Sequence, residues 1–269
     1  MPAIQLARLR IQAAQLASLF DQPESFCREL TDLFELYADR VHRPGQSGEP
    51  PPLIPRYNIS APLLRHLYHE MAPIARLHAD RTLALCDVLW ADPFLESRLL
   101  ASDLLGQAPL RSPDQTLYRV ERWASESTDK RLLDSLVRQG LERLRLEQPS
   151  ILIQQAGSWL GTGDPNLQRL ALAAIIPIVE DSTFENLPAI FHLLAPYIRK
   201  APQSIRADII DTLRTLAKRS PSETAYFLRQ GLEISEGTDT PWLIRQTLVD
   251  FPPDIRESLR EALRVSVKG

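Results

Sequence analysis

The sequence predicts an all-α protein, and two observations carry that prediction. Its 269 residues include only 10 glycines but 22 prolines. Strands and hairpins depend on glycine-rich turns, so this balance favours helices joined by short, proline-marked loops. Apolar residues also recur at helical spacing in one stretch after another. The first such stretch carries Leu6, Leu9, Ala13, Leu16 and Leu19.

The expected helices follow one another along the chain. The first occupies the amphipathic N-terminal stretch, and the second runs from about Pro23 to Val41. Residues 42–55, HRPGQSGEPPPLIP, hold five prolines and two glycines and predict a loop. Further helices follow, and several begin where a capping residue comes just before a proline of the first turn. These residues are Ser60, Ser112, Asp164, Ala201 and Ser220.

This recurring unit of cap, proline and amphipathic stretch predicts antiparallel helix pairs that repeat without a strict sequence period. A helix pair buries its apolar face only against its neighbours, so such units stack. The predicted fold is a right-handed α-solenoid of HEAT-like helix pairs with a concave groove. We expect an N-terminal helical extension over residues 1–41, the loop over 42–55, and one continuous repeat domain over 56–269. A compact irregular helical bundle is the alternative.

Charge and cysteine content exclude several classes of protein. The chain has 31 basic and 34 acidic residues, a net charge of −3, which argues against polyanion binding over the whole surface but leaves a local basic groove open. Cys27 and Cys86 form no CxxC motif and no disulfide framework, so we expect a reducing, cytoplasmic location. No apolar run reaches the roughly 18 residues of a membrane span. We therefore expect no membrane partner. We also expect a monomer.

Familiar catalytic and cofactor motifs are missing from the sequence. It contains no GxSxG, no P-loop and no GxGxxG. His66, His69 and Glu70 share one helix at i, i+3 and i+4, which could supply two metal ligands. No third ligand is evident, and a solvated helix face explains the pattern better. We expect no metal and no cofactor.

One carboxylate and one arginine stand out as candidates for chemistry. In DKRLLDSLVRQGLERL, Asp134 falls at the rim of an apolar helical stripe, with Arg131 and Arg138 beside it. A surface ion pair between Asp134 and Arg138, worth about 0.3–0.5 kcal/mol, is the alternative. Arg169 interrupts LQRLALAAII, a helix that is apolar nearly all round. Such helices are usually buried, yet a guanidinium keeps its charge in proteins.

Five stretches carry a resemblance to a known family. They are YNISAPLLRHL (57–67), VLWADPFLESRLLASDLLG (88–106), RLLDSL (131–136), SWLGTGDPNLQRLALAAI (158–175) and IRADIIDTLRTLAKRSP (205–221). In this order they resemble the DNA alkylation repair enzymes, the AlkD-like alkylpurine glycosylases built from HEAT-like repeats. The resemblance covers roughly residues 55 to 250. It implies duplex DNA as the partner, and leaves open whether that DNA is damaged or structured.

The resemblance also implies roles for particular residues. It places Asp134 where the N-glycosidic bond breaks, and Arg169 on the concave face, against the DNA backbone next to the lesion. Lys130, Arg131 and Arg138 are the further DNA contacts expected around Asp134. Alkylation makes the purine a cationic leaving group, and a fixed carboxylate stabilises the oxocarbenium-like sugar or orients water. A guanidinium holds the phosphate.

The sequence departs from the family at three positions, one of which is Arg131, where the family has an acidic residue. The family has two tryptophans that frame the aspartate, and ungapped matching gives Lys130 and Asp211 there. Neither supplies an aromatic face to a developing cation. The expected function is therefore DNA binding within this superfamily, with weak excision of cationic alkylpurines left open. The alternative is a non-catalytic helical-repeat scaffold that binds a protein partner in its groove.

Local charge agrees with DNA binding. Residues 119–145 contain seven basic and five acidic side chains, and residues 199–219 contain six basic and two acidic ones. The basic excess therefore lies in the repeats that the family uses for DNA. A solvated helix face explains such runs equally well.

Overall fold

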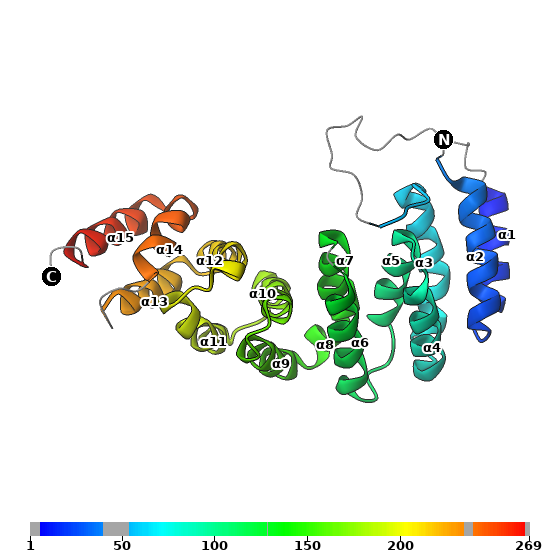
Figure 1. Ribbon diagram of the computed structural model, residues 1–269, viewed down its shortest axis with the longest axis horizontal. Coiled ribbons are helices and arrows are strands. Elements are labelled where there is room, and N and C mark those ends of the chain that lie inside the picture. Colours follow the sequence, from blue (N-terminus) through cyan, green and yellow to red (C-terminus); the bar gives the residue numbers. More distant parts are fainter. Residues whose placement is uncertain (1–5, 40–53, 128, 234–238, 267–269) are drawn as a thin grey trace. The chain divides into compact units, whose positions relative to one another are not determined.

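The computed structural model describes residues 6–39, 54–127, 129–233 and 239–266, and every regular element in these ranges is a helix (Figure 1). The all-α prediction is confirmed for this part of the chain. Clustering of the backbone gives two compact units, Met1–Gln148 and Pro149–Gly269. Each unit is described by itself below.

The first unit consists of α-helices and one π-helical turn. Its elements are α1 (Leu6–Ser18), α2 (Pro23–Tyr37), α3 (Ala61–Ala75), α4 (Ala79–Ala91), α5 (Leu95–Leu105), α6 (Pro113–Glu126), α7 (Lys130–Ser135), the π-turn η1 (Leu136–Gly140) and α8 (Glu142–Glu147). The second helix ends at Tyr37, earlier than the predicted Val41, and Ala38 after it has φ −58° and ψ 134°, which lies outside the helical range. The loop predicted over residues 42–55 lies outside the described residues, apart from its last two positions.

The second unit is built in the same way. Its elements are α9 (Pro149–Gly161), α10 (Pro165–Glu180), α11 (Leu187–Arg199), the 3-10 turn η2 (Gln203–Ile205), α12 (Arg206–Arg219), α13 (Pro221–Glu233), α14 (Thr240–Thr247), the 3-10 turn η3 (Leu248–Asp250) and α15 (Pro253–Ser266). Across the described residues, no helix is long and apolar enough to cross a membrane.

Alternate helices share a layer within each unit. In the first unit α1 contacts α3, α3 contacts α5 and α5 contacts α7, while α2 packs on α4. In the second unit α10 contacts α12 and α12 contacts α14, and a second layer runs through α9, α11 and α13 (Figure 1). Two layers of alternating helices are what stacked helix pairs produce, because each pair buries its face against the next. The helical-repeat prediction is therefore confirmed.

The helix starts follow the sequence signals with one exception. Helices begin directly after Ser60, Ser112, Asp164 and Ser220, as predicted. The carboxylate of Asp164 accepts the backbone N–H of Asn166 at 2.8 Å and so satisfies one of the donors that a helix start leaves open. The hydroxyls of Ser60 and Ser112 occupy cap positions without accepting such a bond.

The exception is the helix predicted to begin at the Ala201–Pro202 pair. There the chain first forms η2, and α12 begins only at Arg206. Pro202 stands in the cap position of the 3-10 turn, and its carbonyl accepts the N–H of Ile205 at 3.1 Å. The tighter turn delays the α-helix by one turn.

Aromatic and ionic contacts hold α6 against α4, outside the layer of α3, α5 and α7. Trp123 of α6 is fully buried and stacks on Trp90 of α4, with 4.6 Å between ring centroids and 7° between planes. Arg119 of α6 lies 2.7 Å from a carboxylate oxygen of Asp87 on α4. Stacked rings of this kind add to the free energy gained from burial alone.

Candidate functional site

Asp134 lies at the edge of an open hollow in the first unit. The hollow has a volume of about 640 Å³ and is lined from α3, α5, α7, η1 and α8. Asp134 is exposed on α7, and the exposed Arg131 and Arg138 line the same hollow. Three of the residues singled out in the sequence therefore share one surface. The ion pair that would join Asp134 to Arg138 stays a prediction.

Lys130 does not join this group. It is the exposed first residue of α7 and contributes nothing to the lining of the hollow. The residue before it, Asp129, caps the start of α7: its carboxylate accepts the backbone N–H of Arg131 at 2.8 Å. An N-cap bond of this kind stabilises a helix by about 1 kcal/mol.

The chain makes a π-turn directly after the helix that carries Asp134. The N–H of Leu141 donates to the carbonyl of Leu136 at 3.0 Å, an i to i+5 bond that widens the helix by one residue. The guanidinium of Arg145 donates to the carbonyls of Val137 and Arg138 at 3.3 and 3.2 Å. It thereby adds side-chain hydrogen bonds to two carbonyls of the turn. Such turns are frequent at functional sites.

A glycine permits the close approach of α5 to this turn. Gly106 follows α5, and a Cβ added there would overlap the carbonyl group of Gln139 in η1. Because backbone and not a flexible side chain stands in the way, a larger residue would force the two elements apart. The wall of the hollow between α5 and η1 therefore depends on this glycine.

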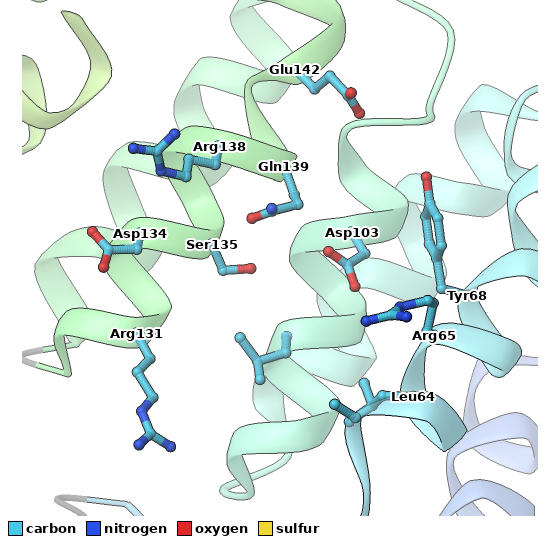
Figure 2. A pocket seen from close by; sticks show the side chains of 12 residues that line it. Leu64, Arg65, Tyr68, Asp103, Arg131, Asp134, Ser135, Arg138, Gln139 and Glu142 are labelled. Atoms are coloured by element: carbon cyan, nitrogen blue, oxygen red, sulfur yellow. The ribbon is translucent and has the colours of Figure 1, made fainter. Parts of the chain in front are cut away.

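Asp103 is the residue of the hollow that sequence reasoning missed. It lies on α5, between Ser135 of α7 and the pair Tyr68 and Arg65 of α3 (Figure 2). Burial, and to a lesser extent the nearby carboxylate of Glu142, raise the pKa of Asp103 to about 7. Among the described residues, no hydrogen bond or ion pair engages the side chain of Asp103. The available signal was an acidic residue inside the apolar stretch LLASDLLG.

A short relay of polar side chains holds Glu142 in place. The Nε of Arg76 donates to Gln107 at 2.7 Å, and the amide nitrogen of Gln107 donates to Glu142 at 3.1 Å. One oxygen of Glu142 is therefore anchored at the hollow.

Burial raises the pKa of Tyr68, and the charges of Glu142 and Asp103 raise it further, so the phenol stays protonated at neutral pH.

A buried glutamate sets the start of α3, which carries Arg65 and Tyr68. Glu96 is 5% exposed, and its two oxygens accept the backbone N–H groups of Tyr57 and Asn58 at 3.1 and 2.8 Å. Asn58 has a φ of 55°, a conformation that few residues other than glycine adopt readily. These bonds hold the chain in this turn just before α3 begins.

Arg169 lies in the second unit, and it is not buried. Its side chain is 45% exposed and donates to the carbonyl of Ser204 at 2.9 Å, with its Nε 3.9 Å from Asp208. The burial that the apolar stretch around Arg169 suggests applies to its polar neighbour, and the role of Arg169 as a DNA contact stays a prediction. Gln168 is 6% exposed and donates to the carbonyl of Leu160 at 3.0 Å. One step of about 100° around the helix separates the two environments.

Asp211 is exposed on α12 of the second unit. Its carboxylate lies 3.3 Å from Arg214, whose guanidinium also lies 3.3 Å from Asp250. The charge of Arg214 is thus balanced by two carboxylates. This pairing lowers the positive potential that the basic excess of residues 199–219 predicts.

Structural contacts also engage part of the basic excess of residues 119–145. Arg119 and Arg122 pair with Asp87, and Arg143 lies 3.0 Å from Glu147. Arg145 donates to backbone carbonyls of η1. The side chains of Lys130, Arg131 and Arg138 on α7 and η1 are exposed, so a polyanion could reach them. Across the described residues, no group of three potential metal ligands is present.

Comparison with known proteins assigns the family. A model of the family described as DNA alkylation repair enzyme matches residues 53–250, which include the whole hollow, Asp134 and Arg169. No curated protein matches the chain. Because the match covers well over half of the sequence, this chain belongs to the DNA alkylation repair enzyme family.

Proposed function

We propose that this protein binds duplex DNA that carries alkylation damage and slowly hydrolyses the N-glycosidic bond of cationic alkylpurines. The observation that carries the proposal is the position of Asp134. In a member of a DNA repair family, it is an exposed carboxylate at the edge of a hollow, with the exposed Arg131 and Arg138 lining the same hollow.

The chemistry requires a negative group beside the sugar. The bond between C1′ and the purine nitrogen breaks, and its electron pair goes to the base, which leaves neutral because alkylation had made it cationic. Water forms the new bond to C1′ and gives up one proton. The carboxylate of Asp134 stabilises the positive charge on the sugar, or accepts that proton.

Arginines supply the contacts to phosphate. Arg131 and Arg138 are exposed on the first unit beside Asp134. On the second unit, Arg169 is nearly half exposed, and its contacts are a backbone carbonyl and a carboxylate at the long distance of 3.9 Å. A guanidinium held in this way can turn to a phosphate at small cost, because exposed ion pairs are weak.

Salt dependence tests the binding part of the proposal. Affinity for duplex DNA should fall steeply with salt, with a slope of about 0.9 per phosphate contacted in a plot of log affinity against log salt concentration. Fluorescence anisotropy with a labelled duplex measures this. A protein that binds no duplex at low salt would contradict the proposal.

One observation favours a second candidate, a scaffold that binds a protein partner. An apolar hollow of about 590 Å³ lies between α11 and α13 of the second unit, with Phe191, Tyr226 and Phe227 in its lining. Tyr226 is 59% exposed, and the lining contains Glu223 but no lysine or arginine. Such a surface suits an apolar peptide side chain better than a phosphate. The scaffold function predicts that the salt titration detects no duplex binding.

A further inference from the structure

We infer that the hollow between α11 and α13 of the second unit is a docking site for a proline-rich segment of a protein partner, with a basic residue at the end of that segment. The inference names the class of partner that this hollow fits. It does not depend on DNA binding, because the DNA contact proposed for this unit lies on α10, in the other layer of helices (Figure 1).

The layer formed by α9, α11 and α13 carries few charged residues. There are none in α9, and α11 has only Arg199, at its last position. In α13 the charged residues are Glu223, Arg229 and Glu233, and Arg229 is turned to α15, where it donates to the hydroxyl of Ser258 at 3.0 Å. By contrast, α12 in the other layer carries six charged side chains. A nucleic acid or a phosphorylated peptide therefore finds little to bind on the layer of the hollow.

Three aromatic rings line the hollow, and two contacts hold them. Phe191 of α11 and Phe227 of α13 have their ring centroids 5.0 Å apart and their planes at 37°. The exposed Tyr226 accepts a hydrogen bond on its hydroxyl from the side-chain amide of Gln230, at 2.8 Å and one turn further along α13. This bond holds the ring before a ligand arrives, so binding costs little side-chain freedom.

These groups suit a polyproline II helix. Proline-rich segments of this kind dock into grooves lined by aromatic rings, and they are ordered before they bind. A polyproline II helix has no internal hydrogen bonds, so its carbonyls need donors from the partner. The hydroxyl of Tyr226 can supply one, because its oxygen accepts from Gln230 and its proton therefore points elsewhere. An α-helical partner gains nothing from this donor, because its own N–H groups already engage its carbonyls.

Glu223 gives the hollow its charge preference. Of the described residues in the lining, it is the one acidic residue, and no lysine or arginine accompanies it. It stands three positions before Tyr226 and so on the same face of α13. A lysine or arginine next to the prolines complements this carboxylate. Because Glu223 is exposed, the pairing should orient the segment and add modestly to its affinity.

Fluorescence anisotropy with the full chain and three labelled peptides tests the inference. The probes are PPPPPPR, the charge-reversed PPPPPPE and the flexible GSGSGSR. We expect PPPPPPR to bind and PPPPPPE to bind about threefold more weakly, as the loss of an exposed ion pair allows. We expect no measurable binding of GSGSGSR, which has the same charge as PPPPPPR but no proline.

Variants of the lining assign the binding to the hollow. Tyr226→Ala should weaken the binding of PPPPPPR by about tenfold or more, because it removes an aromatic anchor. Tyr226→Phe keeps the ring and loses only the hydroxyl, so its effect should be smaller. Glu223→Gln should abolish the difference between PPPPPPR and PPPPPPE. The matched control is Tyr118→Ala, which removes an equally exposed tyrosine from α6 of the first unit and should change nothing.

Thermal unfolding of each variant confirms that it is folded. No binding of PPPPPPR, equal binding of PPPPPPR and GSGSGSR, or binding of PPPPPPR that Tyr226→Ala leaves unchanged would each overturn the inference. Self-association of the wild type that Tyr226→Ala abolishes, measured by analytical ultracentrifugation, would also overturn it, because a second copy would then be the occupant.

Duplex binding separates this inference from the proposed function. Tyr226→Ala should leave the affinity for duplex DNA unchanged, because Tyr226 and Arg169 lie in different layers of the unit. A protein that binds duplex DNA but not PPPPPPR would disprove only the docking site. A protein that binds PPPPPPR but no duplex would disprove only the proposed function.

Discussion

At the scale of single residues, the main finding is a half-buried acid that the sequence did not reveal. Asp103 sits in an otherwise apolar part of α5, and its pKa is about 7 because of burial and of Glu142. Keeping an ionisable group in such a place costs stability, and strongly perturbed acids concentrate at functional sites. Its environment depends on α3, α7 and η1 packing against α5, which no local sequence pattern contains.

The raised pKa of Asp103 predicts a pH dependence of stability. The native state holds the proton up to about pH 7, whereas the unfolded chain releases it near the ordinary value of 3.8. The free energy of unfolding therefore falls between about pH 4 and pH 7. Asp103→Asn lacks this loss, so its stability advantage should widen from pH 5 to pH 8 by on the order of 2–3 kcal/mol, at 1.36 kcal/mol per pH unit. Urea unfolding at both pH values measures it, and a constant difference would contradict the burial of an ionisable group.

Arg169 yields the second prediction at this scale. Because its side chain is nearly half exposed, Arg169→Ala should change the free energy of unfolding by less than about 1 kcal/mol. Its affinity for duplex DNA should fall, and the salt slope should decrease by about one phosphate contact. Anisotropy titrations over a range of salt concentrations give both numbers. An unchanged affinity would remove Arg169 from the DNA contacts.

At the scale of elements, the π-turn η1 shapes the wall of the hollow. It shifts the register after Asp134 by one residue, and Arg145 stabilises it from α8 by binding its carbonyls. The sequence predicted the helix around Asp134 and the shared face of Asp134, Arg131 and Arg138. It did not predict the extra residue of the turn, because nothing in the apolar spacing marks one.

Two glycines provide a matched test of this wall. Gly106→Ala should destabilise the protein by roughly 1–3 kcal/mol, because its Cβ would overlap the backbone of Gln139 and overpack the contact between α5 and η1. Gly161→Ala, at the end of α9, has no atom within 4 Å of the new Cβ and should be neutral or slightly stabilising. Thermal unfolding compares the two. Equal effects would mean that the close approach at Gly106 does not constrain the fold.

The helix boundaries show how far sequence reasoning extends at this scale. Proline in the first turn located the starts of α3, α6, α10 and α13 correctly. Proline has no backbone N–H to donate, and only the first turn of a helix does not need one. It misplaced α12, where the residues after Pro202 form a 3-10 turn first.

Which of Gln168 and Arg169 is buried could not be predicted, because both are polar and adjacent, and packing against neighbouring helices decides between them.

At the scale of the whole molecule, membership of the DNA alkylation repair enzyme family and two layers of alternating helices agree with the sequence. The candidate residues divide between the units. Asp134, Arg131 and Arg138 belong to the first unit with the hollow, and Arg169 belongs to the second. Much of the basic excess is engaged in structural ion pairs, so DNA affinity should depend on a few exposed arginines and not on overall charge.

The most direct test of the account is the release of 7-methylguanine from methylated duplex DNA under single-turnover conditions. The account predicts slow release above the uncatalysed background, abolished by Asp134→Asn, which keeps the shape of the side chain and removes its charge. The variant should still bind the duplex with the affinity of the wild type. No release by the wild type, or release that survives Asp134→Asn, would contradict the assignment of Asp134 as the catalytic carboxylate.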